Sequence, residues 1–294
     1  MTITVLGASG KTGGAAAARL LAAGVSVRAV ARTREKLSGL IAKGATAVAA
    51  DVTNESALTD AFKGSDAIYA MIPGDYTKPD LLGQYVRAAT TIAAAIKASG
   101  VKKVAFLSSL GAELPSGTGP ITGLHRAEER LRAVPGLDLL VLRPGYFYEN
   151  HFGTLGLIKQ QGINGSAIAP DAPMNQIEAR DIGEVAADAL VKGFKGGSVM
   201  ELSGPRPLTM TEATGVLGRA IGKPDLAYVQ FPAAGFIEAI KANGFSDDAA
   251  RLFAEMSDAF NRGIIKSQPG NQVVKTTTTF EAFADGFAQA YHAA

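Results

Sequence analysis

The chain of 294 residues contains no cysteine and only three histidines. The lack of cysteine excludes disulfide bonds, thiolate nucleophiles, iron–sulfur clusters and thiolate zinc sites. His125, His151 and His292 do not show the spacing of metal ligands. We therefore predict that the protein has no metal site and that its chemistry depends on other residue types.

The chain also lacks a strong charge of either sign and a long apolar run. Its 29 Lys plus Arg and 27 Asp plus Glu give a formal net charge of +2. This charge is too small to indicate binding to nucleic acid or to an anionic membrane. No apolar run approaches the roughly 18 residues of a membrane span. Residues Thr2–Leu6 lead into a glycine turn instead of the apolar core of a signal peptide. We expect a cytoplasmic protein that binds a small-molecule substrate.

The first half of the chain alternates short apolar runs with helical patterns. The expected strands are Ile3–Leu6, Ser26–Ala31, Ala47–Ala50, Ala67–Met71, Val104–Leu107 and Leu139–Leu142. The expected helices are Gly13–Ala23, Arg34–Lys43, Ser56–Phe62, Leu81–Ser99 and Leu124–Ala133. Strands separated by helices of this length form right-handed crossovers, and wholly apolar strands are typical of a sheet covered on both faces. The pattern predicts an α/β fold with a Rossmann-type doubly wound parallel sheet over residues 1–150.

After Pro144 the pattern changes. It predicts a smaller α/β lobe over residues 151–294 that covers the substrate and partly returns to the Rossmann sheet. Asp181 and Glu184 have the spacing of a capping box, which predicts a helix that begins at Asp181. A short apolar run, Val199–Leu202, is expected to form a strand.

A glycine-rich loop joins the first strand to the first helix. It reads Gly7-Ala8-Ser9-Gly10-Lys11-Thr12-Gly13. Gly7 permits the tight turn out of the strand, Gly10 lets the backbone approach a diphosphate, and Gly13 permits close packing of helix on strand. The helix N-terminus then offers N–H groups and a partial positive charge to phosphates. A glycine turn without a ligand is the alternative, but the strand before and the helix after favour a dinucleotide site. We predict that Gly7, Ser9, Gly10, Lys11, Thr12 and Gly13 bind the cofactor.

The end of the second expected strand indicates which dinucleotide binds. An acidic residue there would bond the ribose hydroxyls and favour NAD(H). Arg32 stands in its place, and a guanidinium forms charge-assisted hydrogen bonds with the 2′-phosphate of NADP(H). Arg34 and Lys36 are either helpers or solvated residues of a first helical turn. The sequence therefore predicts NADP(H) in preference to NAD(H).

Other strand ends are expected at the ligand, because the carboxyl ends of parallel strands line the crevice of this fold. Asp51 and Val52 follow the third strand and are expected beside the adenine, with a turn role for Asp51 as the alternative. The fourth and fifth strands end at Met71 and at Ser108. We predict cofactor contacts for Asp51, Val52, Met71, Ile72, Pro73 and Ser108, and a place in the substrate pocket for Ser109.

The candidate catalytic residues are few. None of the seven tyrosines has a lysine four residues later, so the Tyr-x-x-x-Lys pair of short-chain dehydrogenases is absent. His125 is a candidate proton donor because its unperturbed pKa of about 6.5 suits acid–base chemistry; a packed or surface histidine is the alternative. Hydride transfer to a quinone needs little acid catalysis, since delocalisation stabilises the developing oxyanion. Tyr146 and Tyr148 are expected to line the substrate pocket or to pack in the core.

These motifs together resemble the NmrA-like family of atypical short-chain dehydrogenase/reductase proteins. The resemblance covers essentially the whole chain and rests on the glycine loop, on Arg32, on the missing Tyr-Lys pair and on Arg143-Pro144-Gly145-Tyr146-Phe147-Tyr148-Glu149-Asn150. It implies a Rossmann domain with a small C-terminal lobe and a dinucleotide at the switch point. Related ether reductases use a lysine on the helix after the fifth strand, where this chain has Leu124, His125 and Arg126.

The resemblance implies two functions, because family members are either NADPH-dependent reductases, including quinone reductases, or redox-sensing regulators without turnover. An oxidoreductase for a small carbonyl, quinone or conjugated substrate requires a largely apolar pocket beside the nicotinamide. An NADP(H)-sensing regulatory protein requires an exposed apolar patch, expected on the helices between Phe236 and Phe260. A homodimer or a regulatory protein partner is compatible with both. We favour the oxidoreductase.

Overall fold

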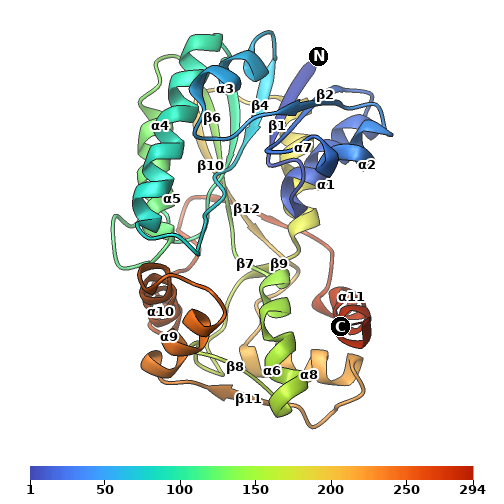
Figure 1. Ribbon diagram of the computed structural model, residues 1–294, viewed down its shortest axis with the longest axis vertical. Coiled ribbons are helices and arrows are strands. Elements are labelled where there is room, and N and C mark those ends of the chain that lie inside the picture. The colour runs from blue at the N-terminus through green and yellow to red at the C-terminus, as the bar shows by residue number, and fades with distance from the viewer. Residues whose placement is uncertain (294) are drawn as a thin grey trace.

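A computed structural model describes residues 1–293 and has an eight-stranded sheet in its larger part (Figure 1). Neighbouring strands are parallel, in the order β12-β10-β6-β5-β4-β1-β2-β3. The strands are β1 (Thr2–Leu6), β2 (Ser26–Ala31), β3 (Thr46–Ala49), β4 (Ala67–Ala70), β5 (Lys103–Leu107), β6 (Asp138–Pro144), β10 (Gly197–Ser203) and β12 (Gln272–Lys275). The predicted fold class and the expected strands are confirmed.

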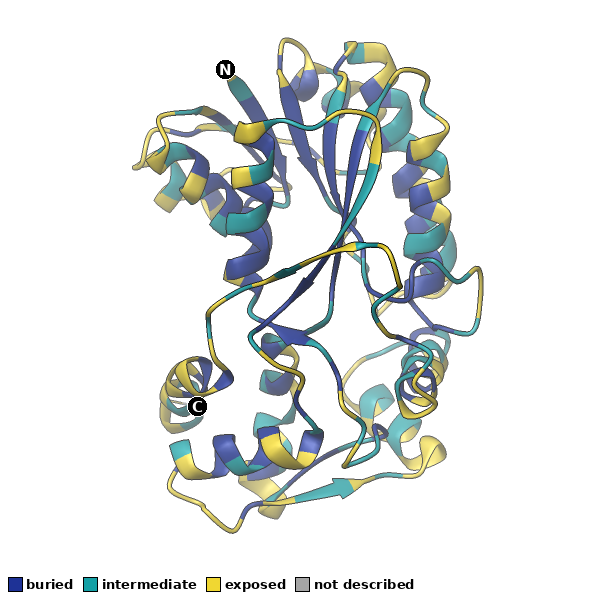
Figure 2. Cartoon of the chain, turned by 180° about the vertical axis from the view of Figure 1, so that it is seen from behind, coloured by how far each residue is buried: buried dark blue, intermediate teal, exposed yellow. Residues whose placement is uncertain are grey.

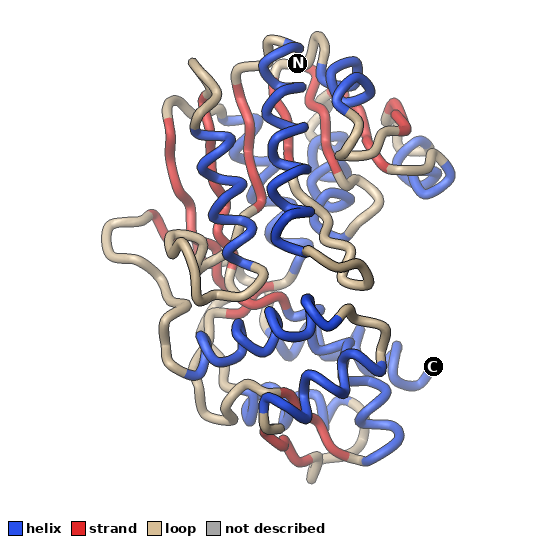
Figure 3. The backbone as a smooth tube through the Cα atoms, turned by 60° about the vertical axis from the view of Figure 1, so that its left-hand side comes forward, coloured by secondary structure: helices blue, strands red, loops and turns tan. Residues whose placement is uncertain are grey.

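Helices cover both faces of this sheet, which explains why its strands are apolar throughout (Figures 2 and 3). One face carries α1 (Lys11–Ala22), η1 (Glu35–Leu37), α2 (Ser38–Ile41) and α7 (Ala179–Lys192). The other face carries α3 (Glu55–Phe62), α4 (Leu81–Ser99) and α5 (Ile121–Arg132). Gly183 permits the close packing of α7 on α1, because a Cβ at this position would overlap the carbonyl oxygen of Thr12.

A smaller lobe lies at the carboxyl ends of the strands (Figure 1). Its helices are η2 (Tyr148–Thr154), α6 (Leu155–Gln161), α8 (Met210–Ala220), α9 (Ala233–Ala242), α10 (Asp247–Asn261) and α11 (Phe280–Ala293). Its strands form two parallel pairs, β7 (Tyr146–Phe147) with β9 (Gln176–Ile177) and β8 (Ile163–Ser166) with β11 (Ala227–Gln230). None of the helices in residues 1–293 is long and apolar enough to cross a membrane.

The chain passes between the two parts more than once. The helix α7 and the strands β10 and β12 belong to the sheet layer although they follow residue 150. The division of the chain into residues 1–150 and 151–294 therefore stays a prediction. Ala294, the last residue of the second part, lies outside the residues that the structure describes.

The predicted start of the helix at Asp181 is wrong. The helix α7 begins at Ala179, and Asp181 lies in its first turn, where it accepts a hydrogen bond from the Thr278 hydroxyl (2.8 Å). The Ala179 N–H instead donates to the carboxylate of Glu149 (3.0 Å), which comes from η2. A carboxylate supplied by a distant segment satisfies this helix N-terminus, so the local Asp181–Glu184 spacing did not indicate the true cap.

Candidate functional site

The strand order reverses between β1 and β4, since β2 and β3 lie beyond β1 on one side and β5 and β6 beyond β4 on the other. A ligand crevice is expected at the carboxyl ends of the strands at such a switch point. Gly7 and Met71 meet there. A Cβ on Gly7 would lie 2.7 Å from the Met71 sulfur, and Gly7 has a φ of +65°. This turn therefore requires glycine.

The glycine loop holds the N-terminus of α1 open. Gly10 is the N-cap residue and provides no side-chain hydrogen bond to the helix. Its N–H donates to the Gly7 carbonyl (2.8 Å), and the Ala8 N–H donates to the Val30 carbonyl of β2 (3.0 Å). A Cβ on Gly13 would overlap the Gly7 carbonyl oxygen. The first N–H groups of α1 thus have neither a capping side chain nor a Cβ in front of them, and this arrangement fits a diphosphate.

The other predicted residues of the loop differ in orientation. Ser9 is exposed, whereas Thr12 is buried. The Lys11 ammonium lies 4.5 Å from the centroid of the Phe152 ring, so its side chain reaches the smaller lobe. Contacts of these three side chains with a dinucleotide stay predictions.

The predicted adenine end of the crevice lies after β2 and β3. Arg32 is exposed directly after β2. Asp51 accepts hydrogen bonds from the Thr53 hydroxyl (2.6 Å) and N–H (2.9 Å), and these bonds, with a smaller contribution from the Arg32 charge, lower the pKa of Asp51. Asp51 therefore stabilises the turn at Thr53, as the alternative role proposed. Both of these hydrogen bonds use Oδ1, so Oδ2 remains available to a ligand. Val52 packs partly buried against the core.

A cavity of about 470 Å³ opens at the carboxyl ends of β4, β5 and β6, next to the smaller lobe. This size is in the range of small-molecule sites. Five of the predicted residues line it: Met71, Ile72, Ser108, Ser109 and Tyr146. Side chains that the sequence analysis did not identify complete the wall, among them Tyr76, Tyr85, Phe253, Phe260 and Lys266. Pro73 does not line the cavity and is exposed.

The loop after β4 connects the sheet to the smaller lobe beside this cavity. The Tyr76 ring stacks on Phe245 (5.5 Å between centroids) and meets Phe253 of α10 edge-on (5.2 Å). The Ser246 N–H donates to the Tyr76 carbonyl (2.8 Å). Tyr76 therefore forms part of the cavity wall that both parts of the molecule share.

The prediction that Tyr148 lines the substrate pocket is wrong. Only Tyr146 faces the cavity, because the chain turns into η2 at Tyr148 and directs this side chain into the core of the smaller lobe. The Tyr148 ring packs against Phe280 (5.0 Å between centroids), and its hydroxyl donates to the Thr278 carbonyl (3.3 Å). Of the two roles considered for this tyrosine, core packing is the one present.

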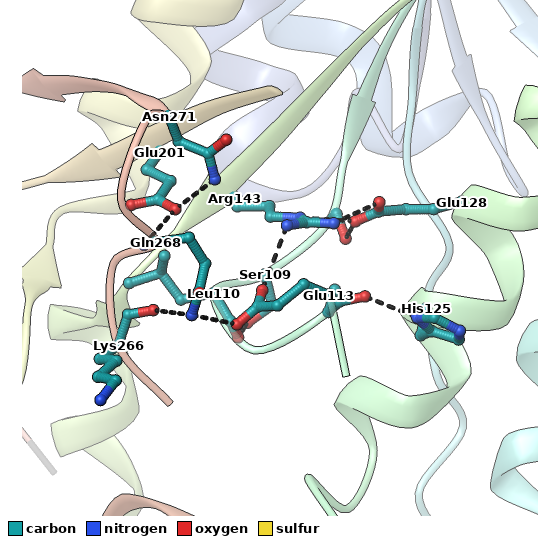
Figure 4. Close-up of polar contacts among 12 residues, drawn as sticks. Ser109, Leu110, Glu113, His125, Glu128, Arg143, Glu201, Lys266, Gln268 and Asn271 are labelled. Atoms are coloured by element: carbon teal, nitrogen blue, oxygen red, sulfur yellow. Dashed lines mark hydrogen bonds and ion pairs between the residues drawn. The ribbon is translucent and has the colours of Figure 1, made fainter. Parts of the chain in front are cut away.

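The structure also places His125 outside the cavity lining. Its Nδ1 lies 2.9 Å from the Ala112 carbonyl oxygen, the contact drawn at the His125 ring in Figure 4. Its Nε2 lies 3.7 Å from the Glu129 carboxylate. The packed histidine considered as the alternative matches these contacts, and the role of His125 as a proton donor stays a prediction. His151 is buried in the smaller lobe, and burial lowers its pKa to about 4, so it stays neutral.

A buried charged network, which the sequence analysis did not predict, supports the ends of β5 and β6 (Figure 4). Glu128 of α5 accepts hydrogen bonds from the Ser108 hydroxyl (2.6 Å) and from Nε and Nη2 of Arg143 (3.0 and 2.8 Å). Arg143 also bonds Glu113 (3.2 Å). Burial alone would lower the pKa of Arg143, but the hydrogen bond and charge of Glu128, with the charge of Glu113, outweigh it and raise the pKa. The network fixes Ser108 beside the cavity.

The apolar patch that a sensing protein would need, expected on the helices between Phe236 and Phe260, stays a prediction. Phe245 and Phe253 pack edge-on against each other, and Phe260 packs beside the core cluster around Leu110 and Ile265. The helix α9 of the same region has no buried residue, and its Phe236 is partly exposed. This surface therefore keeps the structural expectation of the sensing alternative.

Comparison with known proteins agrees with the geometry of the loop and cavity. A family model described as NAD(P)H-binding matches residues 7–192. A (4-alkanoyl-5-oxo-2,5-dihydrofuran-3-yl)methyl phosphate reductase from Streptomyces griseus is 32% identical over 222 residues, which cover 76% of this chain and 74% of the relative. Quinone oxidoreductase 2 from Escherichia coli is 28% identical over 238 residues, covering 80% and 79%. The crystal structure of an NADPH-dependent quinone oxidoreductase from Escherichia coli, complexed with NADPH, superposes with a TM-score of 0.79 at 25% identity and covers 97% of this chain and 99% of that one.

Proposed function

The chain belongs to the NAD(P)H-binding family, and we propose that it is an NADPH-dependent oxidoreductase that reduces quinones or other conjugated carbonyl compounds. The observation that carries this proposal is the position of the cavity. Its walls are largely apolar and aromatic, and it opens at the carboxyl ends of β4, β5 and β6, beside the glycine loop. A substrate ring in this cavity would lie next to a nicotinamide held at the switch point.

The proposed cofactor site uses the glycine loop and the end of β2. The N–H groups at the start of α1, which have no capping side chain, suit the diphosphate, and Gly13 permits the close approach of α1 to Gly7 that shapes this loop. The exposed Arg32 guanidinium at the end of β2 suits the 2′-phosphate of NADPH. When bound, NADPH supplies the hydride. The apolar wall beside the crevice excludes water from the reacting centre.

The hydroxyl groups of the cavity favour a substrate that needs little acid catalysis. The Ser108 hydroxyl donates a hydrogen bond to the Glu128 carboxylate (2.6 Å), and the Ser109 hydroxyl donates one to the Leu110 carbonyl (2.9 Å). Neither hydroxyl proton is thus free for a substrate oxygen. Burial raises the pKa of Tyr146, so this hydroxyl does not ionise. A quinone suits such a site, since its developing oxyanion is delocalised. The names of the two relatives support this class, because a 5-oxo-2,5-dihydrofuran also carries a carbonyl conjugated with a double bond.

The proposal is tested by following NADPH absorbance with a panel of quinones and enones, with NADH in parallel. We expect one NADPH and one proton to reduce each quinone to its hydroquinone, with NADPH preferred over NADH. Formation of the hydroquinone, measured by chromatography, checks the stoichiometry. Tight binding of NADPH without turnover of any acceptor would overturn the proposal in favour of the NADP(H)-sensing alternative.

Arg32→Ala tests the cofactor preference. We expect the dissociation constant for NADPH, measured by isothermal titration calorimetry, to rise roughly 10- to 100-fold, because hydrogen bonds to charged groups contribute about 1.5–3 kcal/mol. The constant for NADH should stay unchanged. Arg126→Ala is the matched control, since Arg126 is an exposed arginine of α5, on the other face of the sheet. Equal affinity of the unmodified protein for NADPH and NADH, unaffected by Arg32→Ala, would contradict the assignment.

A further inference from the structure

The cavity has a single formal charge among the described residues that line it. Its wall contains no aspartate, glutamate, arginine or histidine, and Lys266 is its one charged side chain. The remaining polar groups of the wall are the neutral hydroxyls and amides of residues such as Tyr76, Ser109 and Asn175. Lys266 is exposed, so its charge lies at the solvent side of this wall. It attracts an anion there, because a charge beside a largely apolar wall acts more strongly than one in open water, although solvent and salt screen part of the interaction.

Hydrogen bonds hold the backbone of Lys266 in place at the cavity (Figure 4). Lys266 lies in the segment between α10 and β12. The N–H of Gln268 donates to the buried carboxylate of Glu201 (3.0 Å), and the side-chain amide of Asn271 donates to the same oxygen (2.7 Å). The Gln268 side chain bridges the carboxylate of Glu113 (2.9 Å) and the carbonyl of Lys266 itself (3.2 Å). The ammonium group therefore extends from an anchored segment.

The carboxylates near this segment are engaged elsewhere. Glu113 and Glu128 bind Arg143, and Glu201 accepts two hydrogen bonds from Gln268 and Asn271. None of these carboxylates lines the cavity. Figure 4 shows the Lys266 side chain directed away from Glu113 and Arg143. The lysine charge is thus not engaged by these carboxylates, and an anionic group at the solvent side of the cavity can reach it.

We propose that Lys266 is a specificity-determining residue that binds an anionic group of the substrate, a carboxylate, sulfonate or phosphate, while the aromatic wall holds a conjugated ring. The proposal rests on the proposed function for the identity of the ring. The recognition of the anion follows from the charge of the wall alone. The cavity therefore favours acidic over neutral and cationic compounds of the same shape.

Binding of an inert pair of aromatic compounds tests this directly. In isothermal titration calorimetry with the NADP⁺-loaded protein, we expect 2-naphthoate to bind about tenfold more tightly than the neutral 2-naphthamide, and added salt to reduce the difference. Lys266→Ala should abolish the preference, and Lys266→Arg should retain most of it. Lys275→Ala is the matched control, since Lys275 is an exposed lysine of the same region that does not line the cavity. Equal binding of the two compounds, or a preference that survives Lys266→Ala, would overturn the proposal.

Turnover of a second pair separates this proposal from the proposed function. We expect 1,4-naphthoquinone-2-sulfonate to have a KM about tenfold below that of 1,4-naphthoquinone, with the advantage lost in Lys266→Ala and the KM for the neutral quinone unchanged. If neither quinone is reduced but naphthoate selectivity depends on Lys266, the quinone reductase assignment fails and the anion site stands. If Lys266→Ala instead raises the KM for NADPH, Lys266 belongs to the cofactor site and the substrate role is refuted.

Discussion

Gly13→Ala is expected to lower NADPH affinity more than 100-fold and to destabilise the protein by about 1–3 kcal/mol, the usual cost of overpacking. The added Cβ would overlap the carbonyl oxygen of Gly7, which is backbone and cannot move aside as a flexible side chain would. The loop and the N-terminus of α1 must then separate, and the N–H groups that face the diphosphate are displaced. Calorimetric titration with NADPH and urea unfolding measure the two effects.

Gly156→Ala provides the control for this substitution. Gly156 lies in α6, and a Cβ there would meet no atom within 4 Å. We expect unchanged NADPH binding and a gain in stability of up to about 1 kcal/mol, since alanine loses less backbone entropy than glycine in a helix. If Gly13→Ala binds NADPH as tightly as Gly156→Ala does, the close approach of α1 to the loop is not needed for the cofactor.

Glu128→Gln should cost about 3–5 kcal/mol in the free energy of unfolding, the effect of removing one partner of a buried ion pair. Glu128 is 3% exposed and neutralises Arg143 through two hydrogen bonds. The amide retains the shape of the carboxylate but has no negative charge, so Glu113 is then the carboxylate that still hydrogen-bonds the guanidinium of Arg143. Urea unfolding at neutral pH measures the loss.

Two further variants separate charge from other effects of that substitution. Glu129→Gln changes the next residue of α5, whose side chain is 63% exposed, and should alter stability by less than about 0.5 kcal/mol. Glu128→Gln combined with Arg143→Gln should cost less than Glu128→Gln alone, because no uncompensated charge remains buried. A loss for Glu128→Gln as small as that for Glu129→Gln would show that the pair does not stabilise the fold.

The cofactor half of the molecule was predictable because its determinants are local. The glycine loop, the strand before it and the helix after it lie within residues 2–22, and the apolar runs of the sheet are short and regular. The position of Arg32 at the end of β2 follows from the same pattern. The wall of the cavity was less predictable. Tyr146 was placed correctly, but Tyr148, two residues later, turns away because a helical turn starts there.

The residues missed by sequence analysis are those that meet over long separations. Arg143 was part of a recognised motif, and Glu128 was visible as one acid of a polar helix face, but their pairing depends on how α5 packs beside β6. Lys266 carried no signal at all, since it lies in an irregular segment that Glu113 and Glu201 anchor from distant strands and loops.

Local order along the chain was thus enough to establish the α/β class, the parallel sheet and a dinucleotide loop, because side-chain periodicity and glycine conformations act over a few residues. Tertiary packing alone decided which hydroxyls and which amine share one cavity and which carboxylates stay outside it. The reason is physical: a buried charge or a cavity wall is defined by neighbours that lie more than a hundred residues away, as Gln268 and Glu113 do. That packing left His125 and Tyr148 out of the cavity wall and placed Lys266 in it.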